Sequence, residues 1–145
     1  MSKPKGDVRR DPAYIREQGK REIQEKKRRK ISFSFSMHIS NQGQTFEEWD
    51  QSGLLAPLYT RMKFVGQYSV QEALQNKYIK QYTKVDFPPN SGFIAPKHIV
   101  NVTWAVMHIT NNSKEVVVGY IEDDIFYLIF LDKDHLFWPS TLKNT

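Results

Sequence analysis

Two runs of β-branched and aromatic residues near the C-terminal end constrain the fold of this chain more than any other feature. Residues 116–121 and 125–131 flank the acidic tripeptide Glu122-Asp123-Asp124, and this pattern is typical of a β-hairpin. The second run is apolar or aromatic throughout, so we expect a strand that is buried on both faces. The hairpin therefore predicts the centre of a sheet.

Shorter patterns predict the elements before the hairpin. An Asp-Pro pair at 11–12, followed by glutamates four residues before lysines or arginines, predicts a helix over residues 12–30. Strict alternation over 31–40 predicts a strand, and two capping boxes, at 45–48 and 69–72, predict short helices on either side of an apolar stripe at 54–65. A long connection at 83–98 could cover a sheet face, bind a ligand or serve as a crossover, and residues 100–110 predict a further strand.

This order of elements indicates an α+β fold. We expect a mostly antiparallel sheet made of the first strand and three C-terminal strands, packed by two or three short helices. Lys30 marks the boundary between an N-terminal basic arm, residues 1–30, and a single globular domain, residues 31–145.

The charge of the chain is divided unevenly between these two parts. Residues 1–30 carry 12 lysines and arginines against five acidic residues, whereas the remainder has a net charge of −2 and a single arginine, Arg61. A basic arm on such a body predicts contact with RNA or with an acidic protein partner, and a solvated tail is the alternative. The expected nucleic-acid contacts are Lys26, Lys27, Arg28, Arg29, Lys30 and Lys114.

The composition also excludes several classes of site. The chain has no cysteine, which rules out disulfides and thiolate zinc sites and suits a reducing compartment. It has no apolar stretch of signal-peptide length and no run approaching the roughly 20 residues of a membrane helix, so we expect a cytoplasmic protein without a membrane partner. No glycine-rich phosphate loop or metal motif is present, and we predict neither a cofactor nor a metal. The sequence does not predict an oligomeric state.

The first candidate site follows the predicted buried strand directly, at Asp132-Lys133-Asp134-His135. His135 could act as a general acid or base, and Lys133 could hold a phosphate group as a point charge. Asp134 and Arg61 complete this candidate catalytic set. An ordinary polar turn at the end of a strand is the alternative interpretation.

A second candidate consists of two tripeptides, His38-Ile39-Ser40 and His108-Ile109-Thr110, which both end predicted strands. Paired His-x-Ser/Thr motifs resemble the signature of the 2H phosphoesterases. The resemblance implies that His38 and His108 act as acid and base across a phosphodiester, and that Ser40 and Thr110 bind its oxygens.

Two further resemblances concern the whole body. The ISFSF stretch at 31–35 and the segment at 114–139 resemble a group of small uncharacterised bacterial proteins with an early Phe-Ser-Phe strand and a late hairpin that ends in Leu-Asp-x-x-His. More remotely, the element order resembles the RelE/ParE toxin fold. RelE-like members cleave messenger RNA without a metal, and this resemblance implies that His135 is the acid or base, that Lys133, Arg61 and Lys114 bind phosphate, and that an antitoxin is a partner.

Three hypotheses therefore stay open at this point. The chain is a RelE-like ribonuclease toxin, a non-catalytic module that binds nucleic acid or protein through its basic helix, or a 2H-type phosphoesterase.

Overall fold

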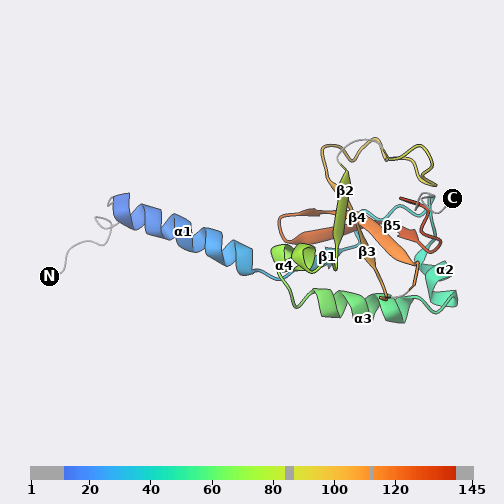
Figure 1. Ribbon diagram of the computed structural model, residues 1–145, viewed down its shortest axis with the longest axis horizontal. Helices are drawn as coiled ribbons and strands as arrows, with labels where there is room; N and C mark the ends of the chain where they lie inside the picture. The colour runs from blue at the N-terminus through green and yellow to red at the C-terminus, as the bar shows by residue number, and fades with distance from the viewer. Residues whose placement is uncertain (1–11, 84–86, 112, 140–145) are drawn as a thin grey trace.

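A five-stranded mixed sheet forms the centre of the molecule (Figure 1). The computed structural model describes residues 12–83, 87–111 and 113–139, without the side chains of residues 24–28 and 83. The sheet has the order β1-β5-β4-β3-β2, in which β1 is parallel to β5 and all other neighbours are antiparallel. The elements in chain order are α1 (Pro12–Arg28), β1 (Ser32–Ser34), α2 (Phe46–Gln51), α3 (Leu55–Val65), α4 (Val70–Gln75), β2 (Lys80–Thr83), β3 (Trp104–His108), β4 (Val116–Glu122) and β5 (Ile125–Asp132). The predicted α+β class and the mostly antiparallel sheet are thus confirmed.

The predicted hairpin is the pair β4 and β5, and β5 lies between β4 and β1. The register of the pair shifts at a β-bulge between Val118 and Gly119. A Cβ atom at Gly119 would collide with the carbonyl oxygen of Tyr127 on β5. Only glycine therefore allows the two strands to approach this closely at the bulge.

Three short helices cover one face of the sheet. Trp49 of α2, Leu58 and Val65 of α3, and Ala73 of α4 are all buried in one apolar cluster with residues of the central strands. Both predicted capping boxes are present: Thr45 caps α2 and Ser69 caps α4, because each hydroxyl accepts a hydrogen bond from the backbone N–H three residues later.

The opposite face is covered by loops instead of helices. The connection between β2 and β3 places Phe93 and Ile99 in a second buried cluster, and Phe137, which follows β5, joins them. Covering a sheet face is therefore one role of this long connection.

Three local expectations differ from the structure. The strand predicted over residues 100–110 is shorter, because β3 covers only Trp104–His108. The strand predicted over residues 31–40 has only the three residues of β1, because the His38 N–H donates to the Phe35 carbonyl (3.1 Å) and turns the chain. Met37 and Ile39 then pack against the loop-covered face, whereas Phe33 packs against the helix-covered face. In addition, β2 forms an edge strand that the sequence pattern did not predict.

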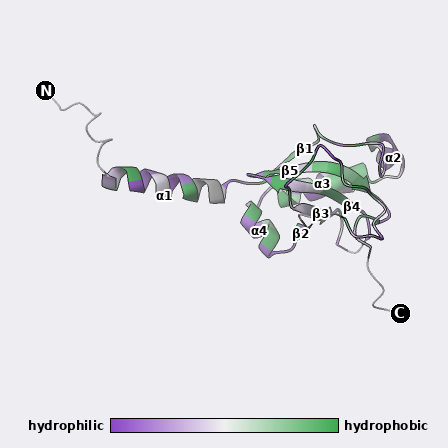
Figure 2. Cartoon of the chain, turned by 90° about the horizontal axis from the view of Figure 1, so that it is seen from above, coloured by the Kyte–Doolittle hydropathy of each residue, from purple (hydrophilic) through white to green (hydrophobic). Residues whose placement is uncertain are grey.

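The basic helix α1 projects away from this body, and Figure 2 shows it as a mostly hydrophilic rod beside the apolar sheet. Its base is held where Arg29 forms an ion pair with Asp124 (3.7 Å) and where Lys30 forms an antiparallel bridge with Ser69. Within the described part of the chain, no helix combines the length and apolar character needed to cross a membrane.

Candidate functional site

The ends of β3 and β5 bring two histidines together. His108 is the last residue of β3 and pairs with Val116, and Val116 pairs in turn with Asp132 at the end of β5. His135 follows three residues later, and its ring centroid lies 5.5 Å from that of His108. We refer to His108 and His135 as the histidine pair.

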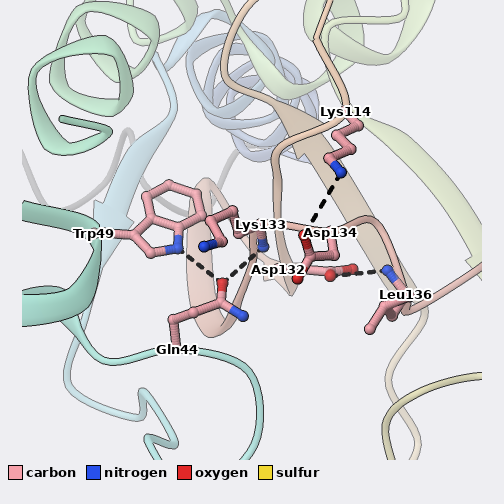
Figure 3. A network of polar contacts seen from close by, with 7 residues as sticks. All are labelled: Gln44, Trp49, Lys114, Asp132, Lys133, Asp134 and Leu136. Carbon is pink, nitrogen blue, oxygen red and sulfur yellow. Dashed lines mark hydrogen bonds and ion pairs between the residues drawn. The ribbon is translucent and has the colours of Figure 1, made fainter. Parts of the chain in front are cut away.

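Asp132 shapes the turn that carries His135. Its side chain is 1% exposed, and its two carboxylate oxygens accept hydrogen bonds from the N–H groups of Leu136 and Phe137, both at 2.8 Å. Figure 3 shows the bond from Leu136. Burial raises the pKa of Asp132, while the two N–H donors act in the opposite direction. The turn places His135 at φ +59°, in the left-handed region. Asp132 therefore belongs to the framework of the turn and does not reach solvent with the residues that follow it.

The hydrogen bond of His108 fixes the tautomer of its ring. Its Nδ1 lies 3.3 Å from the Ser113 carbonyl oxygen, and because a carbonyl can only accept, Nδ1 carries the proton. Nε2 of the neutral ring is then the free acceptor. Burial lowers the pKa of His108, and the nearby charges of His135, Lys80 and Arg61 lower it further, against the opposing effect of the Ser113 carbonyl. His108 is therefore held as a neutral base.

Arg61, the only arginine of the body, reaches this end of the sheet from α3. Its Nε donates to the His108 carbonyl oxygen (3.0 Å), and its Nη2 donates to Oδ1 of Asn111 (2.7 Å). Its guanidinium also lies over the rings of Phe64 and Tyr78, at 5.5 and 5.9 Å from their centroids. Arg61 thus positions the end of β3 and contributes positive charge beside the histidine pair.

Lys114 and Asp134 lie at the same end of the sheet. They form an ion pair at 3.6 Å, and both are exposed. Lys133 is held differently: its backbone N–H donates to Oε1 of Gln44 (2.7 Å), which also accepts a hydrogen bond from Nε1 of Trp49 (2.9 Å). Figure 3 shows Gln44 and Trp49 on one side of this turn and Lys114 on the other. Of the first candidate set, His135, Asp134 and Arg61 therefore gather at this end together with Lys114, whereas Lys133 contacts Gln44 through its backbone.

The two His-x-Ser/Thr motifs lie on different faces of the sheet. The His38 ring contacts Phe46 at the helix-covered side, 4.6 Å between centroids. Alternation along β3 places His108 on the same face as Trp104 and Val106, which belong to the loop-covered cluster.

The motifs are also separated across the sheet. The Ile39 N–H donates to the Ile129 carbonyl oxygen, so the first motif lies beside β5, and the strands β5 and β4 lie between it and β3. Burial lowers the pKa of His38, and its Nε2 is buried without a hydrogen-bond partner. Ser40 is exposed, and Thr110 contacts the hydroxyl of Ser113. The structure does not bring His38 and Ser40 to His108 and Thr110.

The basic arm joins the body at the opposite end of the β4–β5 hairpin from the histidine pair. Arg29 pairs with Asp124 in the hairpin turn, and the eight residues of β5 separate this turn from Asp132 by about 25 Å. Lys26, Lys27 and Arg28 belong to α1, but their side chains lie outside the described residues. The expected nucleic-acid contacts therefore divide between the arm and Lys114 at the far end.

Sequence reasoning missed three members of this site, namely Lys80, Asn111 and Ser113. The hairpin register and the predicted strand at 100–110 together indicate that the ends of the third and last strands are close, and this was the signal that could have paired His108 with His135. In the residues that the structure covers, no group of three histidine, aspartate or glutamate side chains is arranged to hold a metal ion.

Comparison with known proteins gives no match, whether to a protein-family model, to a curated protein or to a solved structure.

Proposed function

We propose that the protein is a metal-independent ribonuclease of RelE-like type that uses the histidine pair as its acid and base. The observation that supports this proposal best is the 5.5 Å separation of the His108 and His135 rings among the cationic residues Arg61, Lys80 and Lys114. Two imidazoles at this spacing can reach the two sides of one phosphodiester.

The reaction that fits the pair is transfer of the RNA phosphate to the neighbouring 2′-hydroxyl. Nε2 of His108 takes the proton from the 2′-hydroxyl, whose oxygen then bonds to phosphorus. The bond from phosphorus to the 5′-oxygen breaks, and His135 in its protonated form gives that oxygen a proton. The products are a 2′,3′-cyclic phosphate and a 5′-hydroxyl, and no other reactant is needed.

The cations supply the electrostatic part of this mechanism. Negative charge grows on the phosphoryl oxygens in the transition state, and fixed positive groups beside them lower its free energy. Lys114 is exposed and Lys80 lies on the edge strand β2, so both are accessible to a polyanion. Arg61 has two of its donor groups engaged with the end of β3 and acts mainly by its charge.

The test is cleavage of a defined RNA by the purified protein in EDTA, with growth followed in an inducible bacterial host. His135→Ala and His108→Ala should each lower the rate by about 10²–10⁴-fold. His98→Ala is the matched control, because His98 is exposed in the connection between β2 and β3. Analysis of the product ends for cyclic phosphate tests the chemistry directly.

The outcomes separate the three hypotheses. Equal activity of wild type and both histidine variants contradicts the proposal, and loss of activity in His38→Ala would support the 2H-type reaction instead. Absence of RNA cleavage under all conditions would leave the non-catalytic binding module as the remaining hypothesis.

The second candidate function, a binding module, is favoured by the projection of α1 away from the body (Figure 1). Reversing the described charges Arg16, Lys20 and Arg21 to glutamate should then abolish binding to RNA or to an acidic protein, while His108→Ala leaves that binding unchanged.

A further inference from the structure

An open apolar groove lies between α2, α3 and the chain after β1. It encloses about 370 Å³, and all six side chains that line it are aliphatic or aromatic: Phe35, Phe46, Leu55, Leu58, Tyr59 and Met62. Phe35 is 43% exposed and Tyr59 is 64% exposed, so the apolar surface of the groove is open to solvent. Apolar surface of this kind marks a place where another apolar surface can bind.

Helix α1 carries a matching apolar stripe. Ile15, Gly19 and Ile23 follow one another at intervals of four residues, which places them on one side of the helix over about 12 Å. Ile15 and Ile23 are 55% and 58% exposed. Apart from the backbone of the helix itself, no atom lies within 4 Å of the Cβ position at Gly19, so the helix backbone can come close to a partner there.

The charges beside the stripe and beside the groove are complementary. On α1, Arg16 and Lys20 each follow a stripe residue and lie on one flank, whereas Glu22 precedes Ile23 and lies on the other. All three are exposed.

On the groove, the acidic and basic sides are likewise separate. Asp50 lies one turn after Phe46 on α2, with Glu47 beside it, whereas Lys63 lies one turn after Tyr59 on α3. A helix that seats its isoleucines in the groove can therefore set its basic flank against α2 and its acidic flank against α3.

The helix of the same chain does not reach this groove. Arg29 is bound to Asp124, and the N–H of Ile31 donates to the Tyr68 carbonyl (3.0 Å), so the base of α1 is fixed. Figures 1 and 2 agree that α1 leaves one end of the body and that α2 lies at the other.

We propose that α1 of one copy docks in the α2–α3 groove of a second copy, and that the exchange is reciprocal. Two copies that lie side by side in opposite directions present each helix to the groove of the partner. The result is a closed twofold dimer with two equivalent helix–groove contacts.

Sedimentation of the nuclease-treated full chain up to about 100 μM tests this proposal, in 0.5 M salt, where the Debye length is only about 4 Å and long-range repulsion between the charged copies is screened. The wild type should form a dimer. The helix variant Ile15→Asp/Ile23→Asp and the groove variant Tyr59→Asp should each weaken the dimer at least about 10-fold. Arg21→Asp on another side of α1, which changes the net charge by as much as the helix variant does, and Thr60→Asp next to Tyr59 are the matched controls and should stay dimeric.

A mixing experiment tests the reciprocal geometry. The helix variant keeps an intact groove and the groove variant keeps an intact helix, so an equimolar mixture should form a heterodimer through one helix–groove contact, although each variant alone is monomeric. A wild type that stays monomeric, controls that dissociate as the variants do, or a mixture that forms no heterodimer would each overturn the proposal. A dimer held by contact between two α1 helices would also give a mixture without heterodimer, because the altered helix of the helix variant could not bind the helix of the groove variant.

Discussion

Replacing Asp132 with alanine should destabilise the protein far more than replacing Asp134, although the two aspartates lie two residues apart. Asp132 is buried and accepts two N–H groups at 2.8 Å, whereas Asp134 forms one exposed ion pair at 3.6 Å. Removal of the carboxylate leaves the two N–H groups without an acceptor, which costs about 1–3 kcal/mol each, and relief of the unfavourable burial that raises the pKa of Asp132 offsets part of this sum.

We therefore expect a net loss of about 3 kcal/mol for Asp132→Ala. At this chain length the loss corresponds to a decrease in melting temperature of about 10 °C. Asp134→Ala should change the free energy of unfolding by at most about 0.5 kcal/mol, because exposed ion pairs contribute little.

Urea denaturation monitored by tryptophan fluorescence measures both variants, and a constant m value would show that the unfolded state is comparable. Under the proposed ribonuclease function, Asp132→Ala should also lose RNA cleavage at temperatures where it is still folded, because the turn that holds His135 is no longer fixed. Equal losses of stability for the two variants, or a loss below about 1 kcal/mol for Asp132→Ala, would refute the view that the buried carboxylate organises this turn.

Four further variants test other parts of the structure. Gly119→Ala should cost at least about 2 kcal/mol in thermal melts, because its Cβ would collide with the neighbouring strand at the bulge, whereas Gly19→Ala should be neutral or stabilise α1 by about 0.5 kcal/mol. Ser69→Ala should cost about 1 kcal/mol in urea titrations through loss of the α4 cap. The pKa values of His38 and His108 are lowered below 6.5, so at these two sites the unfolded chain binds more protons than the folded one near and below that pH. Their contribution to the free energy of unfolding should therefore rise with pH up to about 6.5 and then level off, and His38→Gln/His108→Gln should remove this contribution; an equal slope in the double variant would contradict the assignment.

The predicted parts of the fold are those in which local pattern and burial agree. The hairpin has apolar runs on both sides of an acidic turn, and the two capping boxes carry their own hydrogen-bond partners within three residues. Apolar and polar side chains alternate over residues 31–40 as they do in a strand. The hydrogen bond from the His38 N–H to the Phe35 carbonyl nevertheless turns the chain, and Met37 packs against the loop-covered face of the sheet. Periodicity alone does not distinguish a continuous strand from a short strand and a turn that bury the same residues.

The candidate site was harder to predict, because it depends on register between distant strands. The sequence singles out His135 as a polar residue after a buried strand, and Arg61 as the only arginine of the body. The role of Asp132 was missed, since an aspartate that accepts two backbone N–H groups looks in sequence like any aspartate in a polar turn. The approach of His108 to His135 requires the pairing of three strands at once.

The parallel pairing of β1 with β5 has a consequence for the order of events during synthesis. β1 begins the body, but its sheet partner follows about 90 residues later, and the contact of Gln44 with Lys133 spans a similar distance. Contacts between segments so far apart in sequence form late, because the intervening chain must be closed into a loop first. The histidine pair depends on the same final strand. A nascent chain therefore cannot assemble this site until its last strand has left the ribosome, so the ribonuclease that we propose would remain inert while it is being made.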